Sequence, residues 1–290
     1  MSDIFYTEPT QSNAPNPVLQ IVKAFCYFAL LLGMQVIAIW GVMFYYGFQK
    51  MSEDAEGGIP YDVNDLNIYM TEKTLASTNL ILIIYSALFV LFLLLFFAVR
   101  KKNFFRETQI IKFAPRFLPA VLIISVGLML VINGVLTLLP ASWTESYDEA
   151  SSFVNEGSFG ISLLTKVLLA PIVEELTFRG LMLSRLSKAL PKWLAIAISS
   201  ILFGVIHGNF LWFCYAAILG VVLCLVVGRT GSLLSTIMIH MLFNFYGVAL
   251  SYLAPELTYA VVIIALIVGI PILAFGFYLL FHNKKSKQTS

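Results

Sequence analysis

Charged residues are scarce in this sequence. Asp, Glu, Lys and Arg make up 12% of its 290 residues, hydrophobic residues make up 59%, and the mean hydropathy is +0.88. Soluble domains carry about 25% charged residues, so the composition excludes that class. The small net charge of +2 gives no indication of a nucleic-acid partner. We therefore predict an integral membrane protein surrounded by a lipid bilayer.

Cysteine and histidine are also scarce. The three cysteines, Cys26, Cys214 and Cys224, lie in apolar runs without CxxC spacing, so we interpret them as small buried residues rather than disulfide partners. Of the three histidines, His207 and His240 also lie in apolar runs. An ionisable side chain in hydrocarbon is costly, so both histidines are candidates for a functional site.

Long apolar runs dominate the chain, and most approach the roughly 20 residues that a spanning helix needs. They are too long and continuous for the strands of a barrel. We therefore predict an all-α, polytopic membrane helix bundle with about eight transmembrane helices. The runs are 24–48, 78–99, 117–139, 160–184, 193–212, 213–230, 233–253 and 257–281.

Basic and acidic residues alternate between the connections that join these runs. Because loops rich in Lys and Arg stay cytoplasmic, we expect both termini and the basic connections inside and the acidic loops outside. The basic residues are Arg100, Lys101, Lys102, Arg106, Lys112 and Arg116, then Arg185, Lys188 and Lys192, and finally Lys284, Lys285 and Lys287. The acidic residues are Glu53, Asp54, Glu56, Asp62, Asp65 and Glu72, and then Glu145, Asp148, Glu149 and Glu156.

Two adjacent acids interrupt the fourth apolar run. Glu175 and Arg179 are one helical turn apart, so we expect them to pair along one face. Glu174 differs in direction by roughly 100° and is then free to face a cavity. Pro171 removes a backbone N–H one turn earlier, which membrane helices tolerate where neighbours satisfy the freed carbonyl.

Two further motifs follow on later runs. His207 lies near the end of one run, and His240 and Asn244 share a face of another through a four-residue spacing. A buried carboxylate beside an imidazole can take a proton from water, and a second imidazole and an amide can donate to an oxyanion. The set therefore indicates hydrolysis. A transporter with a buried charge relay is the alternative from another class.

The three motifs together resemble the CAAX protease and bacteriocin-processing family, also called the Abi family. The matching residues are Glu174-Glu175-x-x-x-Arg179, Phe203-x-x-x-His207 and His240-x-x-x-Asn244, and the run Arg229-Thr-Gly-Ser232 is similar too. The resemblance covers about residues 160–250. It divides the single membrane domain into two parts. Residues 1–155 would form a tail and three variable transmembrane helices, and residues 156–290 would form a catalytic helix bundle.

The resemblance implies an intramembrane endopeptidase acting on a membrane-associated peptide or protein. Glu174 would activate water with His207 assisting, His240 and Asn244 would stabilise the oxyanion, and Glu175 and Arg179 would brace the site. It also implies an active site accessible from the cytoplasmic side. The lack of organellar targeting predicts a bacterial plasma membrane, and a non-catalytic bacteriocin-immunity or scaffold protein of the same fold remains an alternative.

Metal dependence is open at this point. Glu174, His207 and His240 could supply the three protein ligands of a catalytic zinc. The chain has no HExxH pair that presents both imidazoles from one helix. We therefore favour a metal-free site without a cofactor, with zinc as the alternative.

Overall fold

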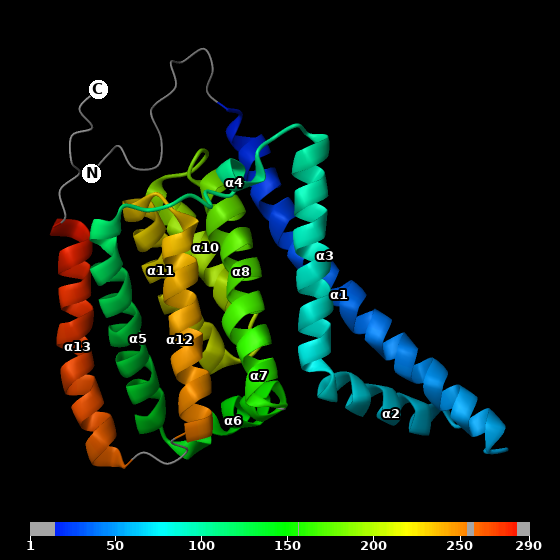
Figure 1. The fold of residues 1–290 in the computed structure, drawn as a ribbon. Coiled ribbons are helices and arrows are strands. Elements are labelled where there is room, and N and C mark those ends of the chain that lie inside the picture. The colour runs from blue at the N-terminus through cyan, green and yellow to red at the C-terminus, as the bar shows by residue number, and fades with distance from the viewer. Residues whose placement is uncertain (1–14, 156, 254–257, 283–290) are drawn as a thin grey trace.

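The computed structural model describes residues 15–155, 157–253 and 258–282 (Figure 1). Every regular element in these ranges is helical, which confirms the predicted all-α class. Glu156 and the basic residues of the C-terminal tail lie outside the described residues.

Seven elements form the first half of the chain. Asn16 caps the first helix by accepting a hydrogen bond from the backbone N–H of Leu19. The elements are α1 (Pro17–Glu56), α2 (Val63–Ala76), α3 (Thr78–Val99), α4 (Phe104–Glu107), the 3₁₀ turn η2 (Pro115–Phe117), α5 (Leu118–Leu138) and α6 (Ala141–Asn155).

The second half begins with one continuous helical run over residues 159–186. Two of its parts are π-helical, namely η3 and η4. We call this run the catalytic helix after the role that the family resemblance implies for its Glu-Glu motif. It comprises α7 (Phe159–Ser162), η3 (Leu163–Leu169), α8 (Ala170–Glu175), η4 (Leu176–Leu183) and α9 (Ser184–Leu186), and it is followed by α10 (Lys192–Val205), α11 (Phe210–Thr230), α12 (Leu233–Leu253) and α13 (Tyr259–His282).

Six described helices are long and apolar enough to cross a membrane: α1, α3, α5 with its η2 turn, α11, α12 and α13. The catalytic helix matches the predicted run 160–184. The predicted run 193–212 is wrong in its boundary, because α10 ends at Val205 and α11 begins at Phe210. The count of eight spans therefore stays a prediction.

Local backbone chemistry explains this boundary. Gly208 adopts a left-handed conformation with φ of 71°, which glycine tolerates without steric cost. Asn209 then caps α11, since its Oδ1 accepts hydrogen bonds from the backbone N–H groups of Leu211 and Trp212 at 3.0 and 3.3 Å. The chain thus turns inside an apolar stretch that hydropathy alone joins into one span.

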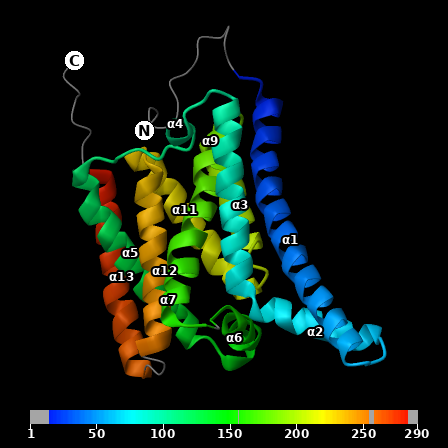
Figure 2. The same cartoon turned by 45° about the vertical axis from the view of Figure 1, so that its right-hand side comes forward.

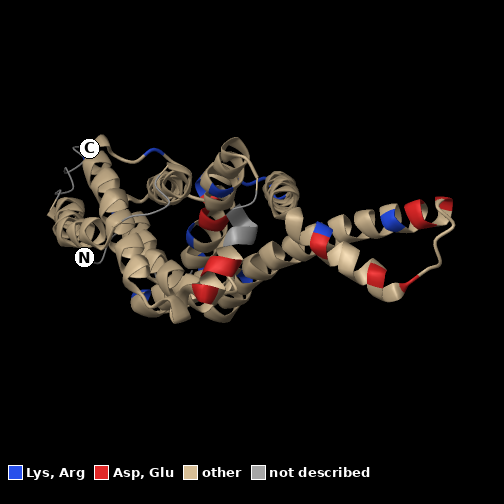
Figure 3. Cartoon of the chain, turned by 90° about the horizontal axis from the view of Figure 1, so that it is seen from below, with Lys and Arg blue, Asp and Glu red and all other residues tan. Residues whose placement is uncertain are grey.

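The helices run between two ends of opposite charge. Residues 51–77 and 141–155 lie together at what we call the acidic end, where α2 and α6 lie across the bundle (Figures 1 and 2). Acidic residues gather on these elements when the molecule is seen from below (Figure 3). Residues 100–116 and 185–192 lie at the opposite, basic end. The charge alternation in the sequence therefore corresponds to two real ends of the bundle.

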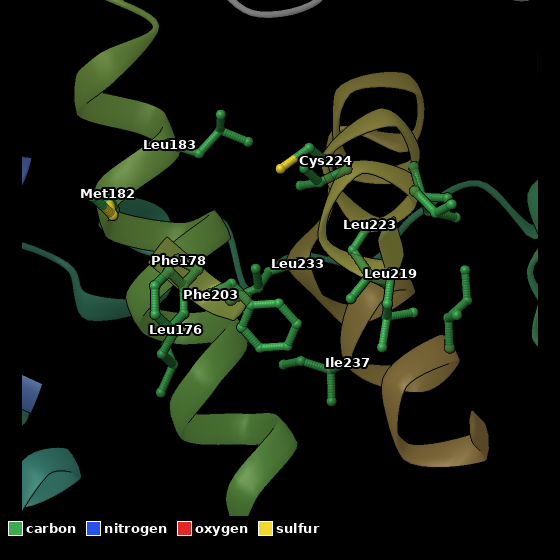
Figure 4. Close-up of a cluster of buried hydrophobic side chains, with 14 of the residues drawn as sticks. Leu176, Phe178, Met182, Leu183, Phe203, Leu219, Leu223, Cys224, Leu233 and Ile237 are labelled. Atoms are coloured by element: carbon green, nitrogen blue, oxygen red, sulfur yellow. The ribbon is translucent and has the colours of Figure 1, made fainter. Parts of the chain in front are cut away.

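The hydrophobic core surrounds the middle of the catalytic helix. Phe178 and Phe203 are fully buried and meet edge to face, with ring centroids 5.3 Å apart (Figure 4). Side chains from α11 and α12 close the cluster, including Leu219, Leu223, Cys224, Leu233 and Ile237. This packing holds four helices in fixed relation around the polar residues.

The cysteines only partly follow their predicted burial. Cys224 is fully buried, as expected, and Cys214 is half-buried. The prediction is wrong for Cys26, which is exposed and lines a groove between α1 and α3. An apolar side chain on a membrane helix is about as stable in contact with lipid as in contact with protein.

Candidate active site

The catalytic helix departs from regular α-helical geometry on both sides of its acidic pair. The π-helical segment η3 ends at Leu169, two residues before Pro171, and η4 begins directly after Glu175. Proline supplies no N–H, so the carbonyl groups before it need other donors. Single π segments are frequent at functional sites because they change the direction of side chains along a helix.

Glu175 and Arg179 form the buried ion pair that their spacing predicts. Arg179 Nη1 donates to Glu175 Oε1 at 2.7 Å, and both side chains are 0% exposed. The guanidinium also lies 4.2 Å from the ring centroid of Phe203, which is a cation–π distance. A Cβ atom at Gly220 would lie 3.2 Å from Arg179 Nη2, so the glycine leaves room for the arginine.

Glu175 has a second partner that the sequence does not predict. His240 Nδ1 lies 3.1 Å from Glu175 Oε1, although the two residues are 65 positions apart. Because the carboxylate is held by Arg179, it accepts the Nδ1–H of His240. This contact orients the imidazole and directs its other nitrogen toward Glu174.

Glu174 faces the interior of the bundle, as predicted from its angular offset. Its side chain is 14% exposed and lines a cavity. Its Oε2 lies 3.6 Å from His240 Nε2, so His240 stands between the two acids. One imidazole thus bridges two neighbouring carboxylates of the same helix.

His207 lies just beyond the end of α10 and lines the same cavity. Its Nδ1 is 2.8 Å from the backbone carbonyl of Phe203. A carbonyl only accepts hydrogen bonds, so Nδ1 carries the hydrogen and Nε2 of the neutral ring is an acceptor. Within the described residues no hydrogen bond or ion pair joins His207 to Glu174.

Asn244 lies one turn after His240 on α12 and also lines the cavity. Its Nδ2 donates to the backbone carbonyl of Lys166 at 2.8 Å. That carbonyl belongs to the π-helical segment η3. One N–H of the amide therefore ties α12 to the catalytic helix, and the other N–H is available for a ligand.

The cavity that these residues share has a volume of about 670 Å³. Aromatic side chains form much of its wall, namely Tyr85, Tyr147, Trp212 and Tyr215. Burial raises the pKa of Tyr147, so its phenol keeps its proton and can donate a hydrogen bond. These dimensions and this lining suit an extended peptide or an apolar chain.

The cavity is open toward the acidic end of the bundle. Its lining begins near the middle of the helices, at Glu174, Leu219 and His240, and continues to residues at the acidic end. The latter are Thr78, Thr137, Ser151 and Ser251. None of the described lining residues belongs to the connections at the basic end.

This opening makes two of our expectations incompatible. Basic loops on the cytoplasmic side would place the acidic end, and with it the cavity mouth, on the outer side. Cytoplasmic access to the site would instead require the reverse orientation of the bundle. Among the described residues the cavity lining reaches the acidic end alone, so the two expectations favour opposite orientations and both stay predictions.

Metal dependence depends on the same donor atoms. Among the described residues, no three or more His, Cys, Asp or Glu side chains are grouped so that they could hold a metal ion. His240 directs Nδ1 to Glu175, and His207 directs Nδ1 to a backbone carbonyl, which leaves Nε2 of each neutral ring as an acceptor. The metal-free site therefore stays a prediction, with zinc as the alternative.

Several wall residues of the cavity were not predicted. Gln35, Tyr85 and Tyr147 come from α1, α3 and α6, which carry no recognisable motif. Tyr147 lies in a segment that composition assigns to a polar outer loop. A single sequence holds no signal that would place these residues beside Glu174, because their proximity depends on how α1, α3 and α6 pack in the bundle.

Comparison with known proteins supports the resemblance. Residues 157–246 match the family model described as Rce1-like, type II CAAX prenyl endopeptidase Rce1-like. The match contains all three motifs, from Glu174 to Asn244, and it confirms the similarity to the CAAX protease family. Neither the curated proteins nor the solved structures give a match.

Proposed function

We propose that the chain is an intramembrane endopeptidase that hydrolyses a peptide bond of a membrane-associated protein or peptide with water activated by Glu174. The observation that carries the proposal is the position of Glu174 in a large cavity, 3.6 Å from an imidazole that a second acid orients. A positioned carboxylate of this kind is a suitable general base.

The first step would be proton transfer from water. Glu174 accepts the proton, while Nε2 of His207 accepts the second water hydrogen and aligns the oxygen lone pair with the scissile carbonyl. The attacking water would lie between these two residues, which line the same cavity. The oxygen then attacks the carbonyl carbon, and the C–O bond forms as the carbonyl π electrons move to oxygen.

The second step would be stabilisation of the tetrahedral oxyanion and loss of the amine. His240 donates from Nε2 when its ring carries both hydrogens, and Asn244 donates the N–H that Lys166 does not use. Glu174 returns its proton to the leaving nitrogen as the C–N bond breaks. Glu175 and Arg179 act as positioning residues, because they reach the reaction only through His240.

We further propose that substrate enters from the acidic end and that this end faces outward. The basic connections carry most of the loop cations, and such loops rarely cross the membrane. This choice keeps the charge-based orientation and gives up cytoplasmic access. The aromatic wall near Tyr147 and Trp212 supports binding of an apolar segment beside the scissile bond.

The alternatives explain the same residues less completely. A transporter needs a route to both faces, whereas the described cavity lining stops near the middle of the bundle. An immunity or scaffold protein does not require a free acid beside an oriented imidazole. No bacteriocin link, metal or cofactor is needed for the proposed reaction, and the oligomeric state does not enter it.

The test is Glu174→Gln. We expect it to abolish cleavage and to leave folding and insertion intact, because the amide keeps the shape of the side chain but cannot accept the proton. The measurement is quantitative proteomics of membrane and secreted peptides from cells that carry each form, followed by turnover of a farnesylated CAAX peptide by purified protein.

The matched control is Glu72→Gln, which changes an exposed acid of α2 far from the cavity wall. It should retain wild-type turnover and peptide profile. Equal activity of Glu174→Gln and wild type would remove the general-base assignment. Activity that disappears on chelation and returns with zinc would overturn the metal-free chemistry.

A further inference from the structure

A second groove lies at the basic end, on the side of the bundle formed by α1 and α3. Its volume is about 250 Å³, and it is separate from the candidate active site. Side chains from α1, α3 and the catalytic helix line it, together with Arg100 and Lys102 from the connection after α3. The groove therefore lies at the basic ends of three long helices.

Four cations line the groove: Lys23, Arg100, Lys102 and Arg185. Among the described residues, the acid bound to them is Glu107, which accepts from Lys102 at 3.1 Å and from Arg185 at 2.8 Å. The groove thus keeps an excess of positive charge. The pKa of the nearby Lys188 is consistent with this excess of positive charge. Burial lowers that pKa most, and the charges of Arg185, Lys102 and Lys23 lower it further, whereas Glu107 acts to raise it.

Arg185 has an unused donor at this place. Its side chain is only 13% exposed, and its Nε is buried and has no hydrogen-bond partner among the described residues. A buried guanidinium N–H without an acceptor is costly. An anionic oxygen bound in the groove would satisfy it.

The floor of the groove is apolar and partly exposed. Phe92 is 40% exposed and stacks on Phe96, with centroids 6.1 Å apart, and Leu30 completes the surface from α1. Arg100 lies 5.6 Å from the Phe96 ring, so the charged rim continues directly into the aromatic floor. A ligand that fits must combine an anionic group with a long apolar part.

We propose that this groove binds an anionic phospholipid, with its phosphodiester on the basic rim and an acyl chain along the phenylalanine floor. Basic pockets between transmembrane helices bind such head groups. A soluble anion would leave the floor uncovered, and a zwitterionic lipid would place a cation against Lys23 and Arg100. The site is independent of the proposed function, although Arg185 connects it to the catalytic helix.

The test measures lipid binding to the full-length protein in detergent micelles by native mass spectrometry. Phosphatidylglycerol is compared with phosphatidylcholine of identical acyl chains. Lys23→Gln with Arg100→Gln removes two rim charges, neither of which has an acidic partner in the described structure. At roughly fivefold per cation, phosphatidylglycerol affinity should fall about 25-fold, and phosphatidylcholine affinity should change little.

The matched control is Arg106→Gln with Lys112→Gln, which removes two exposed cations of the same end outside the groove. It should change phosphatidylglycerol affinity less than about threefold. The charge-conserving pair Lys23→Arg with Arg100→Lys should keep the affinity, which separates loss of charge from loss of fold.

Three results would overturn the proposal. An equal loss of phosphatidylglycerol affinity in the groove variant and in the control variant with Arg106→Gln and Lys112→Gln would indicate diffuse attraction to the charged surface. Equal affinity for the two lipids would remove the role of the rim. Displacement of phosphatidylglycerol by an equal concentration of glycerol 3-phosphate would identify a site for soluble anions.

Discussion

The buried ion pair of the catalytic helix gives the sharpest prediction. Glu175→Gln removes the negative charge that holds both Arg179 and His240, at 2.7 and 3.1 Å, and leaves the shape of the side chain unchanged. Both members of the pair are 0% exposed, so solvent does not screen the loss. We therefore expect lower stability without a change in packing volume.

The magnitude follows from what remains around the arginine. Leaving one partner of a buried pair uncompensated costs about 3–5 kcal/mol. The glutamine oxygen still accepts one N–H, and the Phe203 ring at 4.2 Å still stabilises the guanidinium. Glu175→Gln should therefore lie near the lower limit, about 3 kcal/mol, and Glu175→Ala near the upper limit.

The assay is thermal unfolding of the purified protein in one detergent. A loss of about 3 kcal/mol should lower the melting temperature by on the order of 6 °C. Glu174→Gln is the matched control, since the same substitution one residue earlier breaks no ion pair with an arginine among the described residues. It should melt within about 2 °C of wild type.

A double variant identifies the cause. Glu175→Gln combined with Arg179→Met removes both charges, and replacement of a buried pair by apolar groups is often neutral. It should recover most of the lost stability. A double variant that melts as low as Glu175→Gln alone would refute the argument from an uncompensated charge.

Three further predictions concern the oxyanion, the orientation and the basic end. Asn244→Ala should lower kcat about 100-fold with little change in KM, and loss of its bond to the Lys166 carbonyl should lower stability by roughly 0.6 kcal/mol. A cysteine at Pro60 should react with an impermeant reagent outside intact cells, and one at Lys101 should not. Burial acts to raise the pKa of Glu107, but its cationic partners Lys102 and Arg185 hold that pKa below the ordinary 4.5. The charged carboxylate therefore stabilises the fold above about pH 4.5. This contribution disappears as the pH falls through the lower pKa of the folded state.

Each of these has a result that contradicts it. Unchanged kcat in Asn244→Ala would make the residue a helix contact only. Labelling needs a background without Cys26, Cys214 and Cys224, and reaction at Lys101 alone would reverse the orientation. A Glu107→Gln variant whose stability deficit stays constant from about pH 6 to pH 3 would exclude the carboxylate as the source.

The sequence by itself determined the features that depend on local periodicity and on solvent preference. Apolar runs in lipid must become helices, because no water is present to satisfy the backbone. The spacing of Glu175 and Arg179 placed them on one face, and the adjacent Glu174 had to point elsewhere. The alternation of basic and acidic connections likewise predicted two ends of opposite charge.

Only the tertiary structure decided how the motifs meet. His240 lies between two carboxylates 65 and 66 residues away, and Asn244 binds a carbonyl 78 residues away. These contacts depend on how α12 packs against π-helical segments of the catalytic helix. The direction of the cavity and the cationic groove between α1 and α3 depend on packing too, because an apolar sequence specifies that a helix is buried in lipid or protein but not which neighbour it contacts.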